Sequence, residues 1–375
     1  MSGITLRTAI PTNFKVEYKE FDNVDFVLAY ENSSLVLGSV RVEGVVAISN
    51  NSLPLYDTTN TPSNLDRDIG VDSFVGAHAF FEGITTETNQ GVIENLVNLP
   101  RYEKMMSTGS QMTSDMFNFS NQCELKTPSR EIGRSAIRGI VPFVQMGTPR
   151  HIDPDFSIKP NIALNSADGM LPYRRTGDIR IALNLARVAS ALSGLEITST
   201  TDYTLRDLRI TYRTYPDDGS NNPITLDSKL SIVQSIQSSF ANLDIKVPAV
   251  VNSVSCSFNN QNEVNSLVHN NTALVKIPQL SQVIFQFNDS TNKLISYVLR
   301  DNQEVVARYI DSFQDTGKNQ LSRNNMENND GFGIGLNLNG DIDMTNQKFG
   351  VQIQSGITNN NPMTMYAYFH SSIQI

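Results

Sequence analysis

Tryptophan is absent from this 375-residue sequence, cysteine occurs only twice, and charged residues make up just 18% of the chain. Cys123 and Cys256 lie far apart and outside any metal-binding spacing, which predicts two free thiols in a reducing compartment. No stretch approaches the roughly 18 consecutive apolar residues of a membrane-spanning helix. The first eleven residues lack the apolar core of a signal peptide, so we expect a soluble protein that is made in a cytosol.

Basic residues are outnumbered by acidic ones, 29 to 38, which gives a formal net charge of −9 and an isoelectric point of about 5.0. This balance disfavours a broad surface for direct nucleic-acid binding. The hydrophobic content of 39% is ample for a core, and the 22 glycines and 15 prolines suit strands that are joined by many turns. The length allows two domains, or one domain with a large insertion.

Sequence motifs for catalysis are missing as well. The chain has no GxSxG, no P-loop and no GxGxxG motif, and none of its four histidines has a second histidine or a cysteine three or four residues away. Asp341 and Asp343 raise the hypothesis of a calcium site, but their pattern is more typical of a solvated turn. We therefore predict a protein that is not an enzyme and has no catalytic residue, no cofactor and no metal.

The clearest structural signal lies between Asp178 and Tyr215. Apolar residues alternate with polar ones in Ile179–Leu185, and again in Leu208–Tyr212, which predicts two strands that each bury one face. Two such faces need a second sheet to cover them, so the pattern favours a β-sandwich. We favour a strand over residues 178–188. Residues 182–196 also fit helical spacing, and a helix there is the main alternative to this strand.

Further segments extend this all-β picture. Alternation or dense apolar runs predict strands in residues 35–49, 71–88, 247–258, 283–287, 294–299, 305–310, 349–353 and 363–369. The spacing of Leu226, Leu230, Val233 and Phe240 predicts an amphipathic helix, with Asp227 as its N-cap. The turn-rich residues 216–223 are the best candidate for a domain boundary.

Arginines are the most prominent polar residues beside these strands. The polar faces of the two central strands carry Arg180, Arg206, Arg209 and Arg213. A second group of arginines, with a spacing of four residues, contains Arg130 and Arg134. A solvated or salt-bridged face is the simplest interpretation, a subunit interface is the second, and a DNA-facing patch is the third. We select these six arginines as candidate subunit contacts, with the acidic residues 66–72 and 217–218 as possible complements.

Two stretches together resemble a known family. Residues 71–105 (VDSFVGAHAFFEGITTETNQGVIENLVNLPRYEKM) and 283–309 (VIFQFNDSTNKLISYVLRDNQEVVARY) resemble the penton, or minor capsid, proteins of virophages such as Sputnik and of Polinton-like viruses. That family belongs to the jelly-roll capsid lineage. The resemblance implies a single jelly roll with an inserted or appended β-rich domain and few short helices, and a homopentamer at the vertex of an icosahedral capsid.

Several expectations follow from this resemblance. The jelly-roll base would span residues 1–216 and be completed by residues 345–375, with residues 217–344 as an inserted second domain. The partners would be four further copies and the major capsid protein of the same virion, and the protein would be made in the host cytoplasm. The alternatives are a double jelly-roll major capsid protein that forms trimers, and a jelly-roll module that binds a receptor or carbohydrate. An enzyme on a β scaffold is a further alternative.

Overall fold

The computed structural model describes residues 3–50, 70–109, 123–126, 134–135, 155–193, 199–288, 291–313 and 331–375, except for residues 30, 73, 248, 265, 267, 268 and 301. Strands account for 54% of the chain and helices for 13%, which confirms the all-β prediction. Three large sheets contain most of these strands, and a fourth sheet has only two of the described strands, β6 (Val71–Asp72) and β9 (Arg134–Ser135).

Each large sheet has a defined strand order. The seven-stranded sheet follows the order β10 (Asp155–Ile158), β5 (Arg41–Asn50), β13 (Thr201–Pro216), β4 (Ser33–Val36) and β11 (Met170–Pro172), and β1 (Thr5–Ala9) and β2 (Glu17–Tyr18) also pair with β13. The eight-stranded sheet runs β19 (Ile334–Asp343), β16 (Val250–Asn260), β21 (Met363–Gln374), β14 (Thr225–Ile236), β8 (Gly91–Val97), β7 (Phe81–Thr88), β12 (Ile179–Leu185) and β3 (Asn23–Leu28). The four-stranded sheet runs β15 (Phe240–Lys246), β20 (Lys348–Gln354), β17 (Gln282–Asn288) and β18 (Leu294–Leu299).

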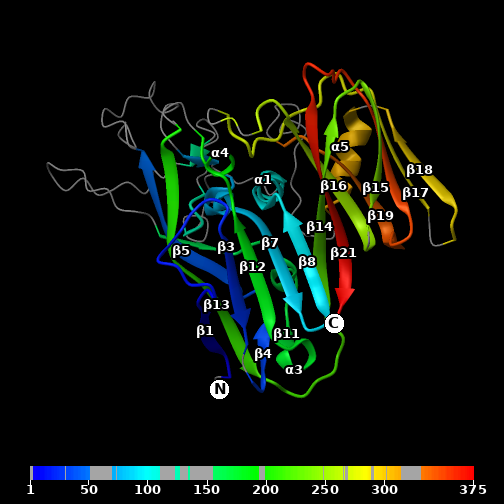
Figure 1. Ribbon diagram of the computed structural model, residues 1–375. Coiled ribbons are helices and arrows are strands. Elements are labelled where there is room, and N and C mark those ends of the chain that lie inside the picture. The colour runs from blue at the N-terminus through cyan, green and yellow to red at the C-terminus, as the bar shows by residue number, and fades with distance from the viewer. Residues whose placement is uncertain are drawn as a thin grey trace.

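These sheets form two β-sandwiches that stand side by side (Figure 1). The first sandwich packs the seven-stranded sheet on the β8-to-β3 half of the eight-stranded sheet, and Phe81 on β7 meets Phe156 on β10 with ring centres 6.1 Å apart. The second packs the four-stranded sheet on the β19-to-β14 half, where Phe349 on β20 meets Phe369 on β21 at 5.4 Å. The eight-stranded sheet therefore contributes one layer to both sandwiches.

The central strands follow the predicted alternation. In β12 and β13 the apolar side chains are buried at alternate positions. The strand predicted for residues 178–188 is confirmed over residues 179–185, in place of the helical alternative. Only the short helix α4 (Val188–Ala191) follows β12. β13 pairs with β5 along most of the length of β13. It also pairs with β1, so β13 lies between these two strands in the seven-stranded sheet.

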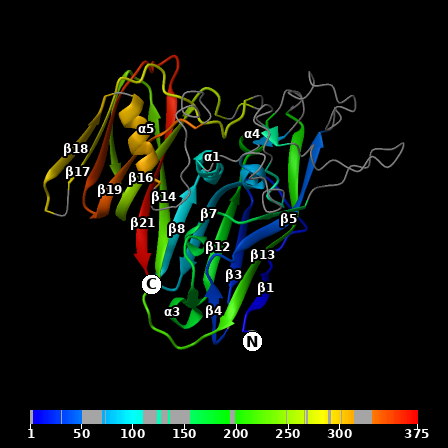
Figure 2. The ribbon, with the colours of Figure 1, turned by 180° about the vertical axis from the view of Figure 1, so that it is seen from behind.

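The two halves of the eight-stranded sheet meet between β8 and β14, which run parallel and pair at Asn95 and Leu230. Here the helix prediction for residues 226–240 is wrong. Residues 225–236 form β14, because all twelve of them pair with β21, and the partner strand outweighs the helical spacing of the apolar residues. Pro100 marks the first turn of helix α1 (Leu99–Gly109), which packs over this junction in Figure 2.

The last two strands belong to the second sandwich. β20 pairs with β15 and β17, and β21 pairs with β14 and β16, so residues 345–375 do not return to the sheet of β5 and β13. β13 ends at Pro216 and β14 begins at Thr225. The prediction of one jelly roll with an insertion is therefore corrected to two sandwiches that follow each other along the chain.

Two other segments differ from the expected strands. Residues 302–311 form helix α5 (Asn302–Asp311), in which Val305 and Tyr309 share the buried face at a spacing of four. Residues 71–88 form β6, the 3₁₀ helix η2 (Gly76–Phe80) and β7 instead of one long strand. Two further short helices of the described residues are η5 (Ala163–Asn165) and α3 (Tyr173–Thr176).

Candidate functional site

The outer face of β13 carries three of the six predicted arginines. A register shift against β5 lies between Arg206 and Arg209, and Asp207 within it has a positive φ of 53°. This bulge inserts one residue, so that Leu205 and Leu208 both point into the core although they are three positions apart. Arg206, Arg209 and Arg213 therefore all lie on the outer side of the sheet.

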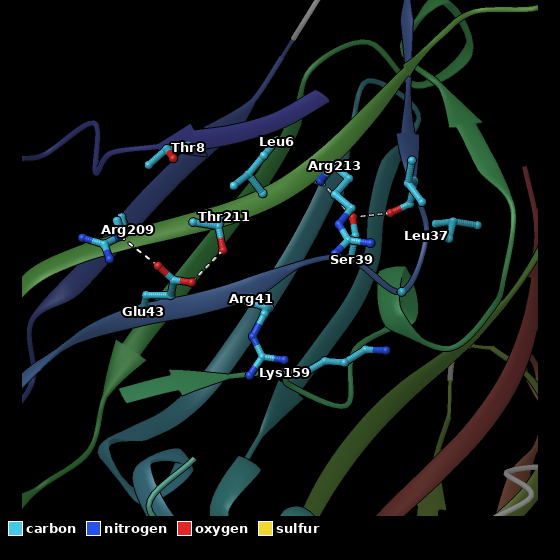
Figure 3. Close-up of a pocket in the computed structure, with 12 residues that line it drawn as sticks. Leu6, Thr8, Leu37, Ser39, Arg41, Glu43, Lys159, Arg209, Thr211 and Arg213 are labelled. Carbon is cyan, nitrogen blue, oxygen red and sulfur yellow. Dashed lines mark hydrogen bonds and ion pairs between the residues drawn. The ribbon is translucent and has the colours of Figure 1, made fainter. Parts of the chain in front are cut away.

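Two of these arginines line a hollow of about 800 Å³ on that face (Figure 3). Strands β1, β4, β5 and β13 bound it together with the residue that follows β10. The lining side chains are Leu6, Thr8, Val36, Leu37, Ser39, Arg41, Glu43, Lys159, Arg209, Thr211 and Arg213, and the backbone of Gly38 completes the wall. Four of the lining residues are basic and only one is acidic.

The single carboxylate of the hollow is already bound within the chain. Arg209 Nε lies 2.9 Å from Glu43 Oε2, while Thr211 Oγ1 donates a hydrogen bond to Oε1 over 3.0 Å. Ser157 Oγ also donates to Glu43 Oε1, over 3.2 Å. Arg41 is fixed by hydrogen bonds from its Nε to Ser157 Oγ (2.8 Å) and from its Nη2 to Ser157 O (2.5 Å). Glu43 therefore neutralises Arg209, and the other cations of the hollow form no ion pair with a carboxylate of the described residues.

The remaining predicted contact residues do not join this hollow. Arg180 is exposed on β12, in the eight-stranded sheet. Arg134 lies in β9, and Arg130 falls outside the described residues. Of the possible acidic complements, residues 66–69 fall outside the described residues, Asp217 pairs with Arg174 at 2.6 Å, and the buried Asp72 pairs with Lys104 at 2.9 Å. Arg41 and Lys159 were not selected from the sequence, because only the fold brings β5 and β10 beside β13.

A buried cluster of charges forms a second notable site, at the junction of the two sandwiches. Glu94 and Lys229 flank the Asn95–Leu230 pair of β8 and β14, and Lys229 Nζ lies 3.8 Å from Glu94 Oε1. Both side chains are almost completely shielded from solvent. Lys229 Nζ is also 3.4 Å from Asp227 Oδ2, and Glu94 Oε2 accepts a hydrogen bond from the Ala163 backbone N–H over 2.9 Å. This ion pair connects the two sandwiches beside their shared backbone contact.

Burial dominates the electrostatics of this cluster. Loss of solvation raises the pKa of Glu94 to about 7, although Lys229 opposes the rise. The same effect raises the pKa of Tyr102, whose ring packs against Tyr368. Close to α1, burial by itself would raise the pKa of Glu124. The charge of the nearby Lys126 outweighs this effect, so the pKa of Glu124 is lowered.

The raised pKa of Glu94 predicts a pH dependence of stability. In the folded state Glu94 keeps its proton up to about pH 7, whereas in the unfolded state it loses the proton near pH 4.5. Because the folded state binds more protons between these values, the free energy of unfolding should fall as the pH rises from 4.5 to 7. The shift corresponds to a loss on the order of 3 kcal/mol. Urea titrations from pH 4.5 to 8 should show this slope in the wild type and a flatter one in Glu94→Gln. An unchanged slope in the variant would contradict the assignment.

The described residues offer no metal site and no membrane-spanning helix. Within the described ranges, no group of three or more histidine, cysteine, aspartate or glutamate side chains lies close enough to hold a metal ion. Asp343 is fully exposed, and its pKa is lowered by hydrogen bonds from the side chain and backbone of Thr345. None of the helices in the described part of the chain is long and apolar enough to cross a membrane.

Comparison with solved structures shows that the chain has the double jelly-roll fold of viral major capsid proteins. The Faustovirus major capsid protein matches all of this chain over 90% of its own length, with a TM-score of 0.59 and 8% identity. The mavirus major capsid protein matches 99% of this chain over 90% of its own, with a TM-score of 0.54 and 10% identity. A chain of the Sputnik virophage cryo-EM structure matches 99% over 86%, with a TM-score of 0.57 and 11% identity. No family model and no curated protein matches the chain.

The penton prediction is wrong in the light of these matches. A penton of the expected kind has one jelly roll, whereas this chain forms two sandwiches and aligns over its whole length with major capsid proteins. The expected homopentamer was implied by the penton resemblance alone and loses its basis with it. The jelly-roll capsid lineage itself agrees with the fold that the comparisons show.

Proposed function

We propose that this chain is a double jelly-roll major capsid protein whose trimers build the shell of an icosahedral virion, after synthesis in the host cytoplasm. One observation carries the proposal: the two sandwiches, joined by one shared sheet, align with major capsid proteins over 99–100% of this chain. The role is structural and requires no catalysis.

The surface of the molecule supports self-association. A closed ring of identical copies needs two different contact surfaces on each copy. Large apolar side chains are exposed on the N-terminal flank of the first sandwich, at Ile4, Leu6, Ile10, Phe14 and Val16. Others are exposed on the second sandwich, at Phe240, Leu294 and Val298. The two groups lie on opposite sides of the molecule, with β1 toward one side and β17 and β18 toward the other (Figure 1).

The oligomeric state tests the proposal. Size-exclusion chromatography with multi-angle light scattering should give a mass about three times the 41.6 kDa of one chain. Electron microscopy of the same fraction should show compact particles with three-fold symmetry. A stable monomer at all accessible concentrations, or a five-fold ring, would overturn the proposal.

A surface variant tests the contact flank separately. Phe14 and Val16 are 66% and 75% exposed, so the double variant Phe14→Glu, Val16→Glu should fold normally, as most exposed substitutions do. We expect its trimer to dissociate at least tenfold more readily, because two carboxylates would be buried without partners. The matched control is Val92→Glu on β8, which is 59% exposed but lies away from this flank. Equal trimer stability in the double variant and in the Val92→Glu control would exclude the N-terminal flank as a contact.

A further inference from the structure

The hollow on β13 contains two cations, Lys159 and Arg213, that pair with no carboxylate in the described part of the chain. Among the described residues, no acidic side chain lies within ion-pair distance of Lys159 or of the Arg213 guanidinium, although Arg209 in the same hollow is paired with Glu43. The chain as a whole has nine more negative than positive charges. A local excess of positive charge at a hollow raises the concentration of anions there and attracts a negatively charged ligand.

The turn between β4 and β5 brings these cations together. Gly38 has a φ of +75°, and a Cβ added there would lie 3.6 Å from Lys159 Nζ, so the ammonium group lies close above the turn. The next residue, Ser39, accepts a hydrogen bond from the Arg213 backbone N–H over 3.0 Å. Asp168 also approaches Gly38, with 3.9 Å from the same Cβ position to its Oδ1, but it forms no ion pair with Lys159 among the described residues.

The third cation is held in place before any ligand arrives. Arg41 lies two residues beyond Ser39, and Ser157 fixes its guanidinium through two hydrogen bonds. Arginine presents several N–H donors in a rigid plane, a geometry that suits phosphate oxygens, and lysine adds a mobile point charge. Figure 3 shows Arg41, Lys159 and Arg213 on the same side of the hollow, apart from the Arg209–Glu43 pair.

We propose that this hollow is a binding site for a small phosphate compound with two or more negative charges. The hollow, at about 800 Å³, exceeds what a single phosphate needs, and Leu6, Val36 and Leu37 give it an apolar wall. The ligand class is therefore an organic phosphate or diphosphate whose charged end meets Arg41, Lys159 and Arg213. The proposal does not depend on the capsid function.

Isothermal titration calorimetry with pyrophosphate tests the site at low ionic strength. We expect binding by the wild type and at least a tenfold loss of affinity in the double variant Lys159→Gln, Arg213→Gln. Both side chains are exposed, so the variant should fold, which its thermal unfolding curve would verify. The control is Arg180→Gln, which removes an exposed arginine from the other sheet and should retain affinity within about twofold.

Three outcomes would overturn the proposal. The first is the absence of pyrophosphate binding to the wild type. The second is equal affinity in the wild type and the folded double variant, which would place the anion elsewhere. The third is binding of a single-stranded oligonucleotide that is lost in the double variant but is not displaced by pyrophosphate, which would make the surface a nucleic-acid contact.

Discussion

Replacing Lys229 by methionine is expected to lower the free energy of unfolding at pH 8 by about 3–5 kcal/mol, because it leaves a buried carboxylate without its cation. Lys229 is only 4% exposed and is the counterion of the fully buried Glu94. The loss should be smaller at pH 5.5. Glu94, with its pKa raised to about 7, is then mostly protonated and needs no counterion. Chemical denaturation at both pH values measures the difference.

Two further variants make this result specific. Lys348→Met removes an ion pair with Asp244 whose side chains are 58% and 55% exposed, and it should cost less than about 1 kcal/mol. Combining Glu94→Gln with Lys229→Met removes both charges and should recover most of the stability at pH 8. Equal losses in Lys229→Met and Lys348→Met would show that the buried pair has no special role at the junction.

Substituting Gly76 by alanine is expected to destabilise the protein by about 2–5 kcal/mol. Its φ of +59° costs an L-residue about 1–2 kcal/mol, and overpacking adds up to about 3 kcal/mol. The new Cβ would lie 2.1 Å from the Glu124 carbonyl oxygen, a backbone atom that cannot rotate away. The same carbonyl accepts a hydrogen bond from the Ala77 N–H over 2.8 Å, so the clash would separate η2 from residues 123–126.

Gly219 provides the matched control for this effect. Its φ of +76° is similar, but no atom lies within 4 Å of an added Cβ. Gly219→Ala should therefore cost only the conformational part, about 1–2 kcal/mol. Thermal unfolding of the two variants, measured side by side, separates conformational strain from the steric clash. A loss in Gly76→Ala no greater than that in Gly219→Ala would mean that residues 123–126 move aside freely.

Local alternation predicted much of the fold. The strands β12, β13, β17 and β20 were recognisable because their buried faces repeat every second residue. β14 was not, because Leu226, Leu230 and Val233 also match a helical period, and the pairing with β21 that decides the matter lies more than 100 residues away. The number of jelly rolls likewise depends on which strands pair, and no local pattern determines that.

The candidate sites show the same limit. Arg209 and Arg213 were selected because they lie on the polar face of a clear strand, and the fold does place them together. Glu94 and Lys229 were missed, because an ion pair between strands from different sandwiches has no signature in either segment alone. Lys159 was missed for the same reason, since β10 reaches the hollow only through its pairing with β5.

The position of β21 has a consequence for how the chain folds during synthesis. The last strand lies between β14 and β16 and pairs with both of them, over twelve and eight residues respectively. Until residues 363–374 have left the ribosome, the second sandwich has two unpaired strand edges and contacts of long sequence separation still to form. The first sandwich can close earlier, so its sheets are expected to act as the template on which the second half of the chain assembles.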